Sequence, residues 1–195
     1  MKKELIQDIK DYVSYLMIPL DNLYFHQYEH ALAVMERAVY LATMEGCSQE
    51  EIELLIIAAL FHDTGFVIQY EENETYGAKI AKNYLRTILY PEAKIKIIEH
   101  LIYATSPKTE PKNKLEEIIK DADMDNLGTK EFFDANERLK HEREIIQKIK
   151  IKDPEWRHAS LNLIEGHKFY THTQKQERNE YLKENIEKLK EKVQK

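Results

Sequence analysis

The sequence predicts an all-helical fold, and three observations support this prediction. Apolar residues recur at intervals of three and four through most of the chain, which is the period of an amphipathic helix. Alternation of apolar and polar residues, the pattern of a half-buried strand, is hard to find. The 195 residues include only 5 Gly and 5 Pro, so few positions interrupt the helical segments.

The first two helices are expected at residues 3–18 and from about Phe25 to Glu45. Apolar positions at helical spacing define the first helix, which ends before Pro19 because a residue preceding proline is pushed out of the helical region. Gly46 ends the second helix, since glycine readily adopts the left-handed conformation that follows a helix.

A buried helix is expected next, from Ser48 to His62. Ser48 and Glu51 have the spacing of a capping box, which marks a helix start. Residues 54–61 are all apolar, and a helix that is apolar on every side is a buried helix. It ends in His62 and Asp63, and buried ionisable groups are costly unless they are paired or bind a metal.

The rest of the chain continues as helices joined by short polar segments. An ordered loop is expected at 64–72, and helices at about 73–89, from Pro91 to just before Pro107, 115–124, 130–150, 154–170 and 173–195. The last helix has one apolar seam, formed by Leu182, Ile186, Leu189 and Val193. This seam is expected to dock on its own domain, and a homodimer contact is the less favoured alternative.

We therefore expect a single domain over residues 1–195. Its core lies at about 20–130, and a C-terminal helical extension follows at about 130–195.

Composition and charge restrict the function. The net charge is -6 with acids and bases interspersed, so we expect no surface for duplex nucleic acid, while a local basic site for a phosphorylated small molecule stays open. Cys47 is the only cysteine, which excludes a disulfide framework and a thiolate zinc cluster. No apolar run approaches the about 20 residues of a membrane span, so a cytoplasmic protein without a membrane association is expected.

Two histidine-containing pairs are candidates for metal binding. His26 and His30 are four residues apart and so share a helix face, although many such pairs are incidental. His62 and Asp63 are neighbours at a helix end, where both side chains can reach one ion. An ordinary structural hydrogen bond between them is the alternative.

Three aspartates follow later in the chain, at positions 121, 123 and 125. Two residues turn a helix by about 200°, so Asp121 and Asp125 face one way and Asp123 the other, and only one of these sets is expected to face the core. The apolar residues around Asp123 favour it as the inward carboxylate. The alternative is an acidic, solvated helix end.

The ordered set of these groups resembles the HD-domain metal-dependent phosphohydrolase superfamily. The resemblance depends on three segments, 26–34, 58–65 and 121–128, which carry a histidine, the His-Asp doublet and a distal aspartate in that order. It covers roughly residues 20–130. Residues 130–195 are similar to the C-terminal helices of one uncharacterised branch of that superfamily.

The resemblance implies His30, His62, Asp63 and Asp123 as ligands of one divalent metal ion. Two imidazoles and two carboxylates suit Mn, Fe, Co, Ni, Mg or Zn. The implied activity is hydrolysis of a phosphomonoester or phosphodiester in a small molecule, with a nucleotide as the favoured class, by a metal-activated water. Asp63 is expected both to bind the metal and to orient that water.

The sequence departs from relatives that bind a second metal. Asn73 stands where they have a histidine, and Val67 stands where nucleotidase-like relatives have an acidic residue. The candidates for the remaining acid–base role are Glu74, His26 and His100.

Lys108, Arg138 and Lys140 are available for phosphate contact, but a solvated helix surface is the favoured interpretation of each. Tyr28 and Tyr70 are expected near the site.

Two other classes of function stay open. A non-catalytic sensor or interaction protein could bind a nucleotide or a metal in the same cleft, and the missing second-metal histidine favours this alternative. An oxygenase of the same superfamily with a di-iron centre would need more ligands than the sequence offers, so it ranks last.

Overall fold

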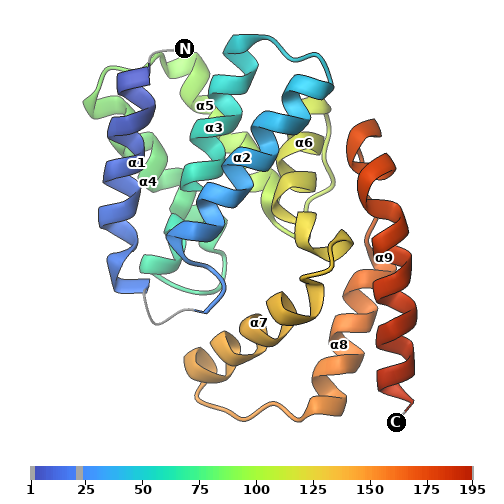
Figure 1. The fold of residues 1–195 in the computed structure, drawn as a ribbon. Coiled ribbons are helices and arrows are strands. Elements are labelled where there is room, and N and C mark those ends of the chain that lie inside the picture. Colours follow the sequence, from blue (N-terminus) through green and yellow to red (C-terminus); the bar gives the residue numbers. More distant parts are fainter. Residues whose placement is uncertain (1–2, 21–23, 195) are drawn as a thin grey trace.

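The computed structural model describes residues 3–20 and 24–194, and within these ranges it is built of helices without strands (Figure 1). The prediction of an all-helical fold is therefore confirmed. The α-helices are α1 (Lys3–Met17), α2 (Tyr28–Met44), α3 (Gln49–Phe61), α4 (Asn73–Thr87), α5 (Glu92–Thr105), α6 (Lys114–Asp123), α7 (Phe132–Gln147), α8 (Asp153–Gly166) and α9 (His172–Val193). Short 3-10 helices are η1 (Ile18–Leu20), η2 (Thr64–Val67) and η3 (Asp125–Gly128).

Helix α3 is the centre of the bundle formed by α1 to α6 (Figure 1). The expected capping box begins it: the Glu51 backbone N–H donates to Ser48 Oγ at 3.3 Å, and the Ser48 backbone N–H donates to Glu51 Oε2 at 2.7 Å. Every residue from Leu54 to Phe61 is buried, and α1, α2, α4, α5 and α6 all pack against this helix. The apolar run therefore fixes the position of the two polar groups that follow it.

The three C-terminal helices contribute to a second apolar cluster. In Figure 1, α7 and α8 lie below the bundle and α9 runs down the right-hand side. Leu182, Ile186 and Leu189 of α9 pack in the cluster, as expected for a seam that docks on its own chain. Helix α9 also reaches back to the bundle, because Arg37 of α2 pairs with Glu177 at 2.8 Å. An ion pair thus connects the C-terminal extension to α2, the helix that carries His30.

Two of the boundaries that differ from the expected ones bear on the site. Helix α2 begins at Tyr28 rather than Phe25, so His26 lies before the helix and not on its face. Helix α8 ends at Gly166 rather than 170, and the next residues are not helical. The backbone N–H groups of Tyr170 and Thr171 donate instead to the Asp121 carboxylate, at 2.9 and 2.7 Å, so they are not available to continue a helix.

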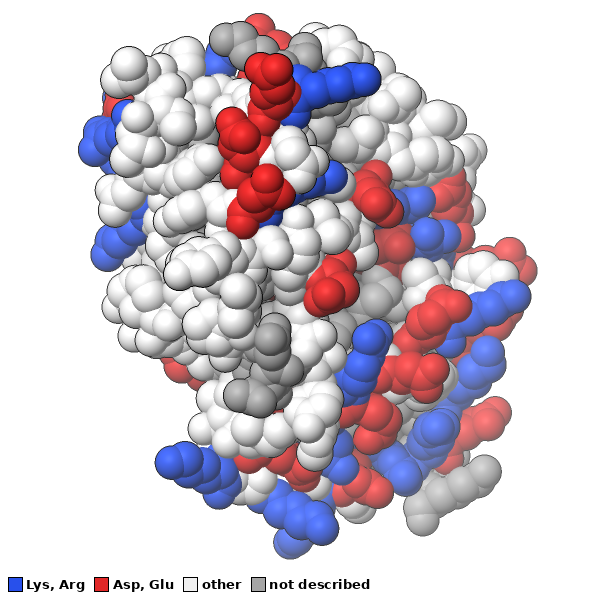
Figure 2. Space-filling view, turned by 60° about the vertical axis from the view of Figure 1, so that its left-hand side comes forward, with Lys and Arg blue, Asp and Glu red and all other residues white. Residues whose placement is uncertain are grey.

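The surface carries charges of both signs. On the face in Figure 2, acidic and basic side chains lie side by side over the lower part of the molecule, where the C-terminal helices are. Within the described ranges, no helix combines the length and the apolar character needed to cross a membrane.

Candidate metal centre

Four side chains from three helices meet at one end of α3. His30 comes from α2, His62 and Asp63 follow the last turn of α3, and Asp123 ends α6. His62 Nε2 lies 3.1 Å from Asp63 Oδ2 and 3.3 Å from Asp123 Oδ1. His30 Nε2 lies 3.2 Å from Asp123 Oδ1 and 3.6 Å from Asp63 Oδ2. The four residues that the resemblance implies are therefore brought together.

The hydrogen bonding of His62 leaves one ring nitrogen free for a ligand role. Its Nδ1 lies 2.7 Å from the carbonyl oxygen of Ala59, and because a carbonyl oxygen only accepts, Nδ1 carries the hydrogen. In the neutral ring the lone pair is then on Nε2, which faces the two carboxylates. His62 Nε2 and Asp63 Oδ2 are buried and lack hydrogen-bond partners among the described residues. Buried polar atoms normally have partners, so these two atoms fit a cation between them.

Two further properties support a cation at this point. One atom each from His30, His62 and Asp123 lie within 4.8 Å of one another, close enough to bind a single ion. Burial disfavours the charged form of His62, but the neighbouring carboxylates of Asp63 and Asp123 raise its pKa well above the usual value. The carboxylates thus require a positive charge beside them, either a proton on the imidazole or a metal ion.

The second oxygen of Asp63 faces helix α4. Asn73 Nδ2 donates to Asp63 Oδ1 at 3.4 Å, and Asn73 is the first residue of that helix. Burial acts to raise the pKa of Asp63, but His62 and His26 outweigh it and lower this pKa. Asp63 therefore stays ionised, and Asn73 contacts its second oxygen.

His26 lies beside the centre, in the segment that precedes α2. Its ring centroid is 5.9 Å from that of His30 and 4.3 Å from that of Phe66. The Nδ1 atom pairs with the carboxylate of Glu142, a fully buried residue of α7. The sequence did not single out Glu142. The residue lies in a stretch of acidic and basic side chains, and such a stretch predicts a solvent-exposed helix face.

The comparisons with known proteins agree with this geometry. A family model described as HD domain matches residues 27–125, just over half of the chain. The chain belongs to the HD-domain family. Family membership supports metal-dependent phosphohydrolase chemistry in general.

Two solved structures share the fold of this HD-domain protein. One is a predicted HD superfamily hydrolase from an uncultured Thermotogales bacterium, with a TM-score of 0.61, 21% identity, and coverage of 96% of this chain and 88% of that chain. The other is Bacillus subtilis YpgQ in complex with ADP, with a TM-score of 0.67, 18% identity, and coverage of 97% and 95%. No curated protein matches the chain.

A cavity of about 250 Å³ borders the candidate metal centre, with His30 as the residue that belongs to both. His30, Asn126 and Arg138 line it together with the aromatic side chains of Tyr24 and Phe25. Arg138, one of the three basic residues considered for phosphate contact, therefore lines this cavity together with His30 of the centre.

The other candidate residues have different surroundings. Lys140 pairs with Asp153, and Lys108 and His100 are exposed. Glu74 is half-buried in the first turn of α4, where its charge acts on Lys120.

The two expected tyrosines differ in their surroundings. Tyr28 packs against the main apolar core, whereas the ring of Tyr70 lies 6.1 Å from that of His26.

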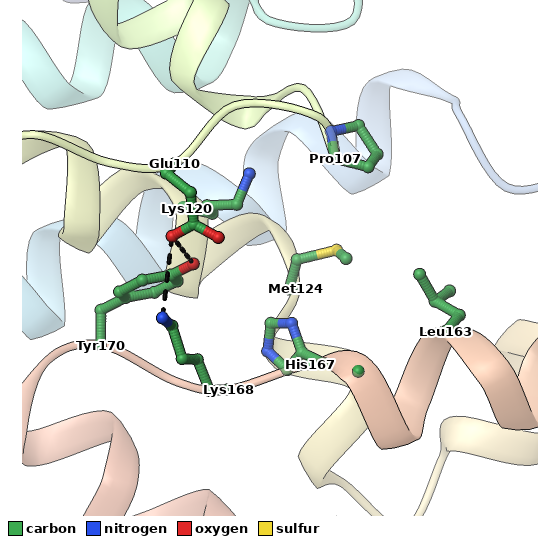
Figure 3. Close-up of a pocket in the computed structure, with 9 residues that line it drawn as sticks. Pro107, Glu110, Lys120, Met124, Leu163, His167, Lys168 and Tyr170 are labelled. Atoms are coloured by element: carbon green, nitrogen blue, oxygen red, sulfur yellow. Dashed lines mark hydrogen bonds and ion pairs between the residues drawn. The ribbon is translucent and has the colours of Figure 1, made fainter.

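A second cavity, of about 180 Å³, lies between α6 and the segment that follows α8 (Figure 3). Lys120 is buried there and donates to the carbonyl oxygens of Ala104 and Ser106 at 3.2 and 2.6 Å. His167 faces Met124 across the cavity in Figure 3, and its buried Nε2 lacks a hydrogen-bond partner among the described residues.

The expectation that only one set of aspartates faces the core is wrong. Asp123 faces the centre, but Asp121 is fully buried on the opposite side. Its carboxylate accepts from Thr171 Oγ1 at 2.8 Å as well as from backbone N–H groups. Asp125 accepts from Arg178 at 2.7 Å. Both sides of α6 are covered, because the C-terminal helices supply a second packing surface that the sequence pattern did not reveal.

Proposed function

We propose that this HD-domain protein hydrolyses a phosphomonoester or phosphodiester in a small molecule, with a nucleotide as the favoured class. His30, His62, Asp63 and Asp123 hold one divalent metal ion in this proposal. The observation that supports it most directly is the pair of unpartnered buried atoms, His62 Nε2 and Asp63 Oδ2, which face each other at 3.1 Å.

The donor set restricts the metal. Imidazole nitrogens with carboxylate oxygens suit Mn, Fe, Co, Ni or Zn, and Mg is acceptable through the carboxylates. When bound, such an ion lowers the pKa of a water molecule and neutralises charge on a phosphoryl oxygen.

The protein's own groups have separate roles in the proposal. Asp63 stays ionised, so besides binding the ion it can accept a hydrogen bond from the attacking water and orient it. His26, beside His30, is the group placed to protonate the leaving oxygen. Arg138 can contact a phosphate from the cavity that His30 also lines, since a guanidinium matches phosphate geometry with two parallel donors.

Two observations favour a nucleotide. The cavity beside His30 combines Arg138 with the rings of Tyr24 and Phe25, so it offers a cation for phosphate and aromatic faces for a base. The similar fold of Bacillus subtilis YpgQ has been solved in complex with ADP.

The experiment begins with elemental analysis of untagged protein. Phosphatase and phosphodiesterase assays then follow in the metal found, with nucleotides and simple esters as substrates. His62→Ala and Asp63→Ala should lose bound metal and at least about a hundredfold in kcat, whereas His100→Ala is the matched control on an exposed histidine. If the protein binds a nucleotide tightly but hydrolyses none of the substrates with Mn, Fe, Co, Ni, Zn or Mg, the proposal is overturned in favour of a sensor.

A further inference from the structure

We propose that Glu142 is a positioning residue that holds the His26 ring in place to protonate the leaving group. This inference rests on the proposed function, and it makes helix α7 of the C-terminal extension a part of the site. Glu142 lies outside residues 27–125, which the family model matches.

The Glu142 carboxylate is saturated by donors from other segments. Oε2 accepts from the backbone N–H groups of Phe25 at 3.0 Å and His26 at 2.9 Å. Oε1 accepts from the Tyr70 hydroxyl at 3.0 Å and pairs with His26 Nδ1. The residue is fully buried, so an ionised carboxylate here depends on these four contacts. Helix α7 thereby fixes both the backbone and the ring of His26.

The contact with Glu142 fixes which ring nitrogen of His26 is available to a ligand. With Nδ1 donating to Glu142, Nε2 is the ring atom left to exchange a proton with a ligand. The ring is packed against Phe25 and Phe66, with centroid distances of 4.8 and 4.3 Å, and only 17% of the side chain is exposed. Its edge-on contact with the His30 ring places it beside the centre.

The proton balance of the proposed step is simple. The oxygen of water forms the new bond to phosphorus while the bond from phosphorus to the leaving oxygen breaks. The leaving oxygen takes the proton from His26 Nε2, and Nδ1 keeps its proton toward Glu142. The attacking water releases one proton to solvent, and His26 takes up one proton from solvent to restore the imidazolium. The products are an alcohol and phosphate from a monoester, or an alcohol and a phosphomonoester from a diester.

A leaving-group comparison separates positioning from a merely structural role. 4-Nitrophenyl phosphate expels a stable anion that needs no proton, whereas phenyl phosphate depends on an acid. His26→Gln should lower kcat for phenyl phosphate by about a hundredfold or more, and for 4-nitrophenyl phosphate by less than about tenfold. Glu142→Gln keeps the side-chain size. It should also lower kcat more for phenyl phosphate than for 4-nitrophenyl phosphate, but by smaller factors than His26→Gln. Glu142→Asp carries the comparison if the Gln variant fails to fold.

Glu144→Gln is the matched control, because Glu144 is on the same helix and accepts a backbone N–H, from Ile151 at 2.8 Å. It should leave the ratio of the two rates unchanged. Equal losses on both esters in folded Glu142→Gln would overturn the positioning role.

A second measurement does not depend on activity. In metal-free protein, nitrogen-15 NMR of His26 should report a hydrogen on Nδ1, and Glu142→Gln should remove this preference while Glu144→Gln keeps it. An unchanged His26 spectrum in folded Glu142→Gln overturns the inference. If the wild-type protein hydrolyses neither ester, the proposed function fails, and the NMR comparison still decides whether Glu142 orients His26.

Discussion

Gly65 and Gly77 bring the segment after the His-Asp doublet into direct backbone contact with helix α4. A Cβ atom on Gly65 would lie 2.8 Å from the backbone nitrogen of Gly77 and 1.8 Å from the carbonyl oxygen of Asn73. A Cβ atom on Gly77 would lie 2.9 Å from the carbonyl oxygen of His62. Only hydrogen fits between these backbones, so the two glycines set where Asp63 stands relative to Asn73.

Gly65→Ala should therefore destabilise the protein. The added methyl group meets backbone atoms that cannot rotate away, so the cost should reach about 3 kcal/mol in the free energy of unfolding. Urea denaturation followed by circular dichroism measures it. Gly166→Ala is the control, since a Cβ there has no heavy atom within 4 Å. Equal stability of the two variants would contradict the close contact.

Divalent metal should stabilise the folded protein if the four residues of the centre hold an ion. A ligand present at a hundred times its dissociation constant adds about 2.7 kcal/mol to the free energy of unfolding. The midpoint of thermal unfolding should rise when Mn²⁺ is added to metal-free protein. The rise should vanish in Asp123→Asn and persist in His100→Ala, and an equal rise in both variants would place the ion elsewhere.

Asp121→Asn should loosen the C-terminal helices without removing a metal ligand. The change leaves buried N–H groups of Tyr170 and Thr171 facing an amide in place of a carboxylate, which costs about 2 kcal/mol or more. Urea denaturation measures the loss, and Asp134→Asn, on the exposed face of α7, is the control. A variant as stable as wild type would show that these bonds contribute little.

Much of the centre could be predicted because its residues lie in short segments with strong local patterns. The apolar run before His62 identified a buried helix, and the position of Asp123 on α6 followed from its apolar neighbours. Glu142 could not be predicted, because its partners Phe25 and His26 stand more than a hundred residues earlier. Helical periodicity shows which side chains share a face, but not which distant segment covers that face.

The burial of Asp121 could not be predicted for the same reason. Its partners lie in the segment after α8: Tyr170, the last residue of the helix expected at 154–170, and Thr171, which follows it. Helix α8 ends at Gly166. The backbone N–H groups of Tyr170 and Thr171 donate to Asp121 on α6, a contact that helical periodicity does not reveal.

The last prediction concerns pH and His167. Burial, and then the positive charge of Lys120, lower the pKa of this imidazole to about 4, against 6.5 in the unfolded chain. Between these two values the unfolded state binds more protons than the folded state, so the stability present above pH 6.5 is lost as pH falls toward 4. The full loss from this group is roughly 3 kcal/mol.

His167→Gln isolates this effect, because glutamine does not titrate and the other ionisable groups remain in both proteins. Urea denaturation at neutral pH and near pH 5 should show a steeper decline in the free energy of unfolding for wild type than for the variant. His158→Gln, on an exposed histidine of α8, should decline like wild type. Parallel declines in wild type and His167→Gln would show that the His167 ring is protonated in the folded protein as easily as in water.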